Sequence, residues 1–130
     1  IKLCLINRNK SIKATMSKQP CWDEERTISR LGGDRSLIEK LVTLFLRDAP
    51  GQLHQALNGI QRQDYDESHV AVHSLKGTSS NFCTVHFEGI CTELLKALKL
   101  QDWQEAASIH AELTKAYYQL EVEFELFLSL

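Results

Sequence analysis

The chain has 130 residues, of which 43% are hydrophobic, and this is enough to bury one core and favours a single domain. Its net charge of −2 is unevenly spread: residues 1–20 carry five basic side chains and no acid, and the rest carries 10 basic and 17 acidic residues. Such an acidic body argues against nucleic-acid binding. No run reaches the roughly 18 apolar residues of a membrane span. The four cysteines lack zinc-site or disulfide-framework spacing, so we expect reduced thiols in a cytoplasmic protein.

Residues 1–21 show no sustained periodicity and are interpreted as a flexible linker or an expression-derived segment. Residues 22–130 are therefore expected to form the folded domain. Within it, Trp22 to Leu31 is predicted to be a short helix that Gly32 and Gly33 bring to an end.

A long helix is predicted to begin after Asp34, which has the side chain of an N-cap. Its buried face is expected to consist of Leu37, Leu41, Leu44 and Phe45. Pro50 lacks a backbone donor, so a kink or restart is expected between residues 48 and 51. The apolar pattern then resumes at Leu53, Ala56, Leu57 and Ile60.

Three more helices are predicted in the second half of the chain. Asp64, with Glu67 in the capping-box position, begins one that runs to about Asn81. The next has an apolar stripe at Phe87, Ile90, Cys91, Leu94 and Leu98. Asp102 caps the last, whose stripe is Ala106, His110, Leu113, Tyr117, Leu120, Phe124 and Phe127. Strand signals are weak, and the predicted fold is all-α: an antiparallel four-helix bundle with a short additional N-terminal helix.

One face of the predicted helix that begins after Asp64 carries a histidine toward solvent. On a helix of 3.6 residues per turn, five side chains fall within about a sixth of a turn of His73. They are Asp66, His69, Lys76, Gly77 and Ser80. The opposite side holds Ala71, Leu75, Thr78 and Phe82, which are expected to face the core. Glycine inside a helix costs about 1 kcal/mol relative to alanine, so Gly77 requires a reason, and close approach by another protein is a sufficient one.

The stretch His73-Ser74-Leu75-Lys76-Gly77-Thr78-Ser79 resembles the phosphorylation motif of histidine-containing phosphotransfer (HPt) domains. These domains relay phosphate between receiver domains in multistep two-component signalling. The resemblance covers about residues 22–130 and includes the segments 31–34, 45–50 and 91–94. Two positions depart from the family pattern: Cys83 stands where a glycine is usual, and Leu95 where an acidic or amide residue is common.

The resemblance implies a role for each residue of the motif. His73 would accept a phosphoryl group from a receiver aspartate and pass it to another receiver aspartate. Lys76 would compensate the phosphate charge, Gly77 would give clearance for the partner, and Ser80 would offer a hydrogen bond. A neutral imidazole, with an unperturbed pKa near 6.5, is a competent nucleophile at cytoplasmic pH.

The cofactor and partner expectations follow from the same resemblance. Magnesium is expected on the receiver domain, and the chain is expected to need no cofactor of its own. It shows no nucleotide-binding loop, so it should have no ATP-dependent kinase activity. The isolated domain is expected to be a monomer. The chain opens without methionine, and we expect it to be the C-terminal module of a bacterial hybrid sensor histidine kinase anchored in the inner membrane; a freestanding phosphotransfer protein is the alternative.

Two rival interpretations of this face remain open. Asp66, His69 and His73 have a spacing that can chelate zinc or iron, but Val70 stands where the catalytic zinc signature has glutamate, so a functional metal site is not expected. Alternatively, exposed apolar side chains such as Val70 could dock a receiver domain in a noncatalytic helical adaptor.

Other charged or titratable residues are assigned to the surface. Lys96 and Lys99 are interpreted as an exposed basic face, with added charge near the site as the alternative. His54, His86 and His110 are assigned to the bundle surface or its margins.

Overall fold

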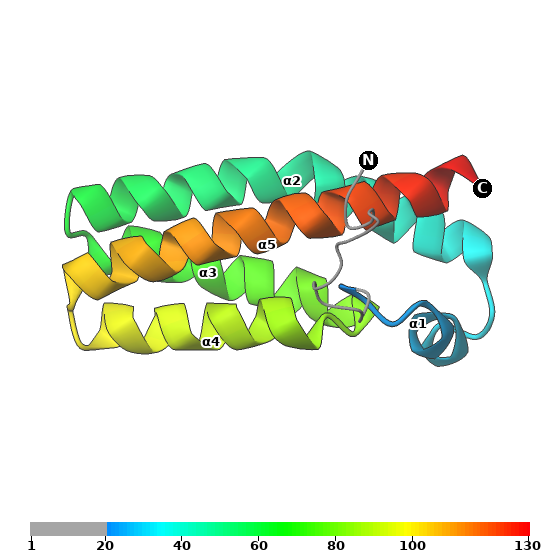
Figure 1. The fold of residues 1–130 in the computed structure, drawn as a ribbon, viewed down its shortest axis with the longest axis horizontal. Coiled ribbons are helices and arrows are strands. Elements are labelled where there is room, and N and C mark those ends of the chain that lie inside the picture. Colours follow the sequence, from blue (N-terminus) through cyan, green and yellow to red (C-terminus); the bar gives the residue numbers. More distant parts are fainter. Residues whose placement is uncertain (1–20) are drawn as a thin grey trace, which may run out of the picture.

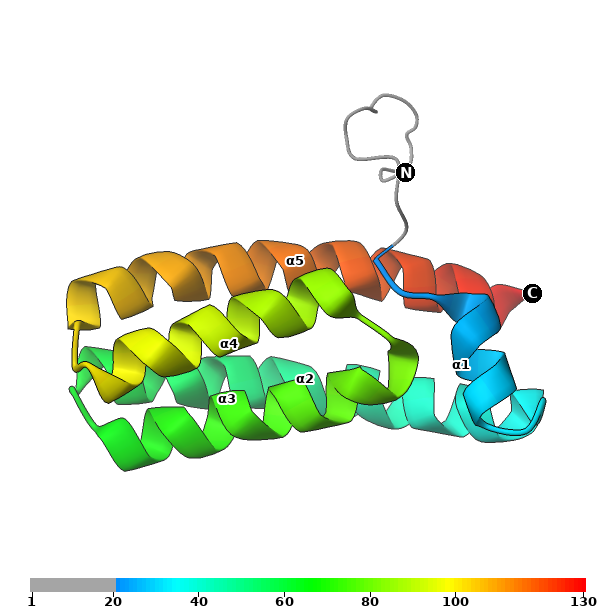
Figure 2. The same cartoon turned by 90° about the horizontal axis from the view of Figure 1, so that it is seen from below.

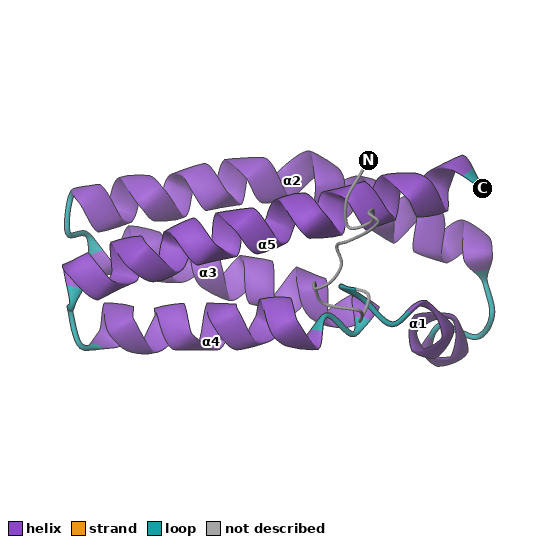
Figure 3. Ribbon diagram, viewed as in Figure 1, coloured by secondary structure: helices purple, strands orange, loops and turns teal. Residues whose placement is uncertain are grey.

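The computed structural model describes residues 21–130, which form five α-helices, a single 3₁₀ turn and no strand (Figures 1 and 3). The elements are α1 (Glu24–Arg30), α2 (Arg35–Gln61), α3 (Tyr65–Ser79), η2 (Ser80–Phe82), α4 (Val85–Lys99) and α5 (Trp103–Ser129). The all-α prediction is confirmed. The predicted linker at residues 1–21 lies, except for Cys21, outside the described residues. Within residues 21–130, no helix has the length and apolar character needed to cross a membrane.

The four longer helices pack around one core (Figures 1 and 2). Helix α2 contacts both α3 and α5, and α4 contacts the same two helices, so the contacts close into a ring. The short α1 lies across one end, where it contacts η2 and the beginning of α2 (Figure 2). This arrangement is a helical bundle in which α3 has packed neighbours on both sides.

Aspartate caps set the beginnings of four of these helices, as the sequence indicates for three of them. The side chains of Asp23, Asp34, Asp64 and Asp102 each accept a hydrogen bond from the backbone N–H three residues later. Each cap satisfies an N–H group that has no partner within the helix. The reciprocal half of the capping box does not form: the Asp64 N–H donates to the Gly59 carbonyl at 2.7 Å, and the Glu67 carboxylate pairs with Arg62 at 3.0 Å. Gly32 and Gly33 end α1 with φ values of 72° and 77°.

The predicted buried face of α2 is partly wrong in its first half: Phe45 is buried as predicted and Leu41 is partly buried against the core, but the other two leucines are not. Leu37 and Leu44 are 38% and 43% exposed, and the buried residues there are Ile38, Val42, Phe45 and Ala49. Both sets have helical spacing, and the packing of α2 against its neighbours selects the second set. In the second half Leu53, Ala56 and Ile60 are buried as predicted.

Pro50 does not interrupt α2, so the expected restart is also wrong. The helix is continuous from Arg35 to Gln61 with Pro50 inside it. Pro50 is exposed, and its missing N–H leaves only the carbonyl of residue 46, one turn earlier, without its helical donor.

The predicted stripes of α4 and α5 are confirmed, with one revised placement. His110 is 6% exposed, and its Nε2 lies 2.8 Å from the carbonyl oxygen of Leu53, which ties α5 to α2. It is therefore a hydrogen-bonded core residue and does not belong to the surface. His54 and His86 are exposed, as predicted.

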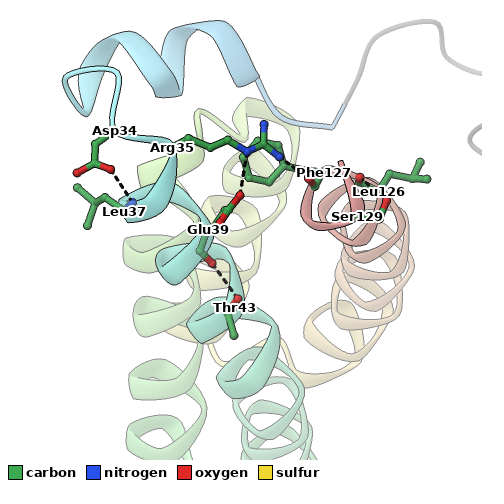
Figure 4. Close-up of polar contacts among 8 residues, drawn as sticks. All are labelled: Asp34, Arg35, Leu37, Glu39, Thr43, Leu126, Phe127 and Ser129. Carbon is green, nitrogen blue, oxygen red and sulfur yellow. Dashed lines mark hydrogen bonds and ion pairs between the residues drawn. The ribbon is translucent and has the colours of Figure 1, made fainter.

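Arg35 joins the beginning of α2 to the end of α5 (Figure 4). Its guanidinium carbon lies 4.1 Å from the centroid of the Phe127 ring, and Nη2 donates a 2.7 Å hydrogen bond to the Phe127 carbonyl. Its Nε pairs with Glu39 at 2.8 Å. A cation at the C-terminal end of α5 also complements the helix dipole.

An aromatic cluster fills the core at the end of α3. Phe82 contacts Trp22, Phe45 and Phe124 edge to face, with ring centroids 4.9–6.2 Å apart. Trp22 contacts Phe127 in the same way at 5.2 Å. These contacts fix the end of the helix that carries His73.

Candidate functional site

Helix α3 divides into a buried and an exposed face. His73 is exposed, and Ala71, Val72 and Leu75 are buried. Thr78 was expected in the core but is exposed, and its hydroxyl donates to the Ser74 carbonyl at 3.0 Å. Ser79 takes the buried position in its place. The histidine thus stands on the solvent side of a helix whose opposite side is anchored in the core.

Close backbone packing holds this helix against α2. A Cβ atom at Gly59 would lie 2.6 Å from the backbone nitrogen of Ser68, so the two helices approach as closely as glycine permits. Ser68 is buried, and its hydroxyl donates to the carbonyls of Asp64 and Tyr65. The site is therefore built on a helix that packs directly against α2.

Gly77 faces open space. A Cβ atom built at this position would meet no heavy atom within 4 Å outside its own helical turn. Nothing in the described part of the chain requires glycine here, in contrast to Gly59. Gly51 and Gly89 face open space in the same way, so what sets Gly77 apart is its place beside the exposed His73, where the fold leaves room for a partner.

Lys76 supplies a positive charge one turn after His73. The lysine is half-buried, and no carboxylate of residues 21–130 forms an ion pair with it. The Lys76 charge also acts on a group of α4, the Cys91 thiol. Burial raises the pKa of the Cys91 thiol to about 12, Glu88 acts in the same direction, and Lys76 opposes both. An ammonium group without a carboxylate partner is suited to compensate an incoming anion.

Ser80 is already engaged in the structure. Its hydroxyl donates a 2.7 Å hydrogen bond to the Gly77 carbonyl. To donate to a phosphoryl group, the hydroxyl would have to leave this acceptor.

Arg30 is a second cation at this end of α3, and sequence reasoning missed it. Its Nη1 donates to the Ser80 carbonyl at 3.2 Å and contacts the Cys83 sulfur at 3.5 Å. The two partners lie 50 and 53 residues away in the chain, and no sequence signal links them to Arg30.

The two departures from the HPt pattern have structural explanations. Cys83 has a φ of 54°, in the left-handed region that favours glycine, so the turn between η2 and α4 is made with cysteine at that position. Leu95 is half-buried and packs against the core.

The geometry does not favour the metal interpretation. The rings of His69 and His73 are stacked with centroids 5.7 Å apart and an interplanar angle of 22°. Their nitrogens therefore lie in nearly parallel planes and do not converge on one point. Across residues 21–130, no three His, Cys, Asp or Glu side chains gather closely enough to hold a metal ion.

Other predicted surface residues lie outside this arrangement. Lys96 and Lys99 are exposed near the end of α4. Val70, the apolar residue invoked for docking, is 57% exposed on α3.

Comparison with known proteins relates this geometry to a family. The sequence profile of the Hpt domain matches residues 40–123, which is more than half of the chain. A comparison with curated proteins gives no match.

Three solved structures share the fold. Histidine-containing phosphotransfer protein B from Pseudomonas aeruginosa is 22% identical, with a TM-score of 0.77 over 85% of this chain and 96% of its own. A putative histidine-containing phosphotransfer protein from rice is 20% identical, with a TM-score of 0.74 over 84% and 80%. The HPT domain of a sensor hybrid histidine kinase from Shewanella is 19% identical, with a TM-score of 0.71 over 84% and 94%. At these identities the likeness establishes the fold, and the profile match establishes the family. The chain belongs to the Hpt domain family and acts in the phosphorelay of two-component signalling.

Proposed function

We propose that His73 is the residue that receives the phosphoryl group from a receiver aspartate and passes it to a second receiver aspartate. The observation that carries this proposal is the exposed position of His73 beside Gly77, where a Cβ atom would meet nothing. A receiver domain can therefore approach the imidazole closely without displacing any part of the bundle.

The reaction follows from the chemistry of the two groups. A ring nitrogen of neutral His73 attacks the phosphorus of the aspartyl phosphate, a P–N bond forms, and the P–O bond to aspartate breaks with the electron pair leaving on the carboxylate. The other ring nitrogen keeps its proton. Transfer to the second receiver reverses these steps. The receiver domain supplies a magnesium ion that neutralises phosphate charge, and the chain needs no cofactor of its own.

Two neighbours of His73 assist by charge and shape. Lys76, which lacks a carboxylate partner in the described part of the chain, balances negative charge on the transferring group. Gly77 leaves room for the partner. Ser80 contributes a hydrogen bond only when its hydroxyl leaves the Gly77 carbonyl.

The wider context is also a proposal. We infer an antiparallel four-helix bundle, with α1 across one end, that works as a monomer and has no ATP-dependent kinase activity. The chain would be the C-terminal module of a bacterial hybrid sensor kinase, cytoplasmic but attached to a parent anchored in the inner membrane. Its similarity to the Shewanella hybrid-kinase domain supports this placement, and its similarity to protein B of Pseudomonas supports the freestanding alternative.

The test is phosphoryl transfer from a phosphorylated receiver domain in the presence of magnesium. We expect acid-labile, alkali-stable phosphate on the wild-type protein and none on His73→Gln. His54→Gln, which removes an exposed histidine from α2, is the matched control and should be labelled normally. Loss of label from His54→Gln, or label on His73→Gln, would contradict the assignment.

A noncatalytic adaptor is the second candidate, and the exposed Val70 on the same helix favours it. The two functions predict the same complex with a receiver domain. They differ in one result: a His73→Gln protein that binds its receiver and still signals normally would identify an adaptor.

A further inference from the structure

A column of three rings runs along the exposed side of α3. Tyr65 and His69 are stacked, with centroids 5.2 Å apart and an interplanar angle of 30°. His69 and His73 continue the stack at 5.7 Å and 22°. The three residues follow one another at intervals of four, so each ring lies one helical turn beyond the last.

The column has an anchored end and a free end. Tyr65 is half-buried and packs against the hydrophobic core, His69 is half-buried, and His73 is exposed. Helical side chains lean toward the N-terminus, so each ring lies over the residue four positions earlier. The packed Tyr65 ring therefore restricts the orientation of the His69 ring, and the His69 ring in turn restricts that of His73.

We propose that His69 is a positioning residue, whose ring stacks on His73 and holds the reactive imidazole in one rotamer for phosphoryl transfer. This inference rests on the proposed role of His73 as phosphoryl acceptor. No other described ring contacts His73, so without His69 its side chain would have no stacking partner.

Stacking is compatible with the chemistry of the ring. The lone pair that attacks phosphorus lies in the plane of the imidazole, and a stacked neighbour covers only a π face. His69 therefore limits rotation of the His73 side chain and leaves the ring edge open to the partner. In-line transfer depends on such alignment.

The expected size of the effect follows from the number of rotamers. A free histidine on a helix has two common χ1 wells, and its χ2 is roughly two-fold. Holding one of about four arrangements should therefore raise the transfer rate about fourfold over an unstacked ring.

The test compares His69→Ala, which removes the ring, with His69→Phe, which keeps a ring that can stack but cannot titrate or bind metal. His86→Ala, at an exposed position on α4, is the control for loss of a surface histidine. The first measurement is the χ1 distribution of His73 from three-bond NMR couplings in the unphosphorylated protein. We expect a single His73 rotamer in the wild type, in His69→Phe and in His86→Ala. In His69→Ala we expect couplings averaged over more than one His73 rotamer.

The second measurement is the single-turnover rate of transfer from a phosphorylated receiver at saturating concentration, together with the receiver affinity. We expect about fourfold slower transfer in His69→Ala, recovery in His69→Phe, and the same affinity throughout. An unchanged rate in His69→Ala, or a His69→Phe protein as slow as His69→Ala, would overturn the proposal. Failure of the underlying function looks different, because the wild type would then show one His73 rotamer and acquire no phosphate.

Discussion

Replacing Gly77 with alanine is expected to make the protein more stable and its phosphoryl transfer slower. A Cβ atom at this position meets nothing within 4 Å, so the change introduces no internal clash. Alanine is favoured over glycine in a helix by about 0.5–1 kcal/mol. Because the new methyl group points into the space that we assign to the receiver domain, transfer should fall by about tenfold, as expected for overpacking of 1–3 kcal/mol at a close contact.

Gly59→Ala is the matched control, because the same substitution there meets the opposite environment. Its Cβ atom would lie 2.6, 2.8 and 2.9 Å from three atoms of Ser68, two of which are backbone atoms that cannot move without separating α2 from α3. Overpacking should cost about 3 kcal/mol, against about 1 kcal/mol of improved helix propensity. We therefore expect a net loss of about 2 kcal/mol in the free energy of unfolding.

Urea denaturation followed by circular dichroism measures both stabilities, and transfer from a phosphorylated receiver measures function. We expect opposite signs of the stability change for the two variants, with the functional loss in Gly77→Ala. A Gly77→Ala protein that is less stable than the wild type would show that the position is not open. A more stable variant with normal transfer would refute the clearance role of Gly77.

Three further predictions concern charge and burial. Lys76→Met should slow transfer by about 10–100-fold without loss of helicity, because one charge-assisted contact contributes about 1.5–3 kcal/mol; a transfer assay checks this, and Lys76→Arg should retain most of the rate. Arg35→Ala should lower the free energy of unfolding by about 1–2 kcal/mol, because it loses the contacts with the Phe127 ring and carbonyl shown in Figure 4. Arg47→Ala is the control: it breaks only an exposed ion pair and should leave urea denaturation unchanged. Burial raises the pKa of the Cys91 thiol to about 12, so only the unfolded chain releases this proton between about pH 9 and 12. The free energy of unfolding should therefore fall in this range by about 1.4 kcal/mol per pH unit. Denaturation across the range checks this, because the contribution of this thiol to the pH dependence should be missing in Cys91→Ala.

Features that depend on short stretches of chain were predictable. The caps at Asp34, Asp64 and Asp102 were identified because the side chain and the N–H that it satisfies are three residues apart. The exposure of His73 followed from the angular separation of polar and apolar residues on one helix.

Errors arose where two local choices were equally good. Leu37 and Leu44 have the same periodicity as Ile38 and Val42, and the packing of neighbouring helices decides between the two sets. Thr78 and Ser79 are adjacent residues of similar polarity, and only the burial of α3 distinguishes them. Prediction of a restart at Pro50 assumed that loss of one backbone hydrogen bond would end the helix, but α2 continues through this exposed residue.

The sequence by itself determined that the chain is helical, that an exposed histidine follows a capped helix start, and that a lysine and a glycine accompany it. These conclusions need only periodicity, propensity and the recognisable His-x-x-Lys-Gly pattern. The tertiary structure decided that Gly59 serves packing while Gly77 faces open space, and that Arg30 contacts the Ser80 carbonyl. It also decided that His110 is a core residue bonded to Leu53. The physical reason is distance along the chain: these contacts join different helices, and local sequence carries no information about which side chains the packing of the bundle brings together.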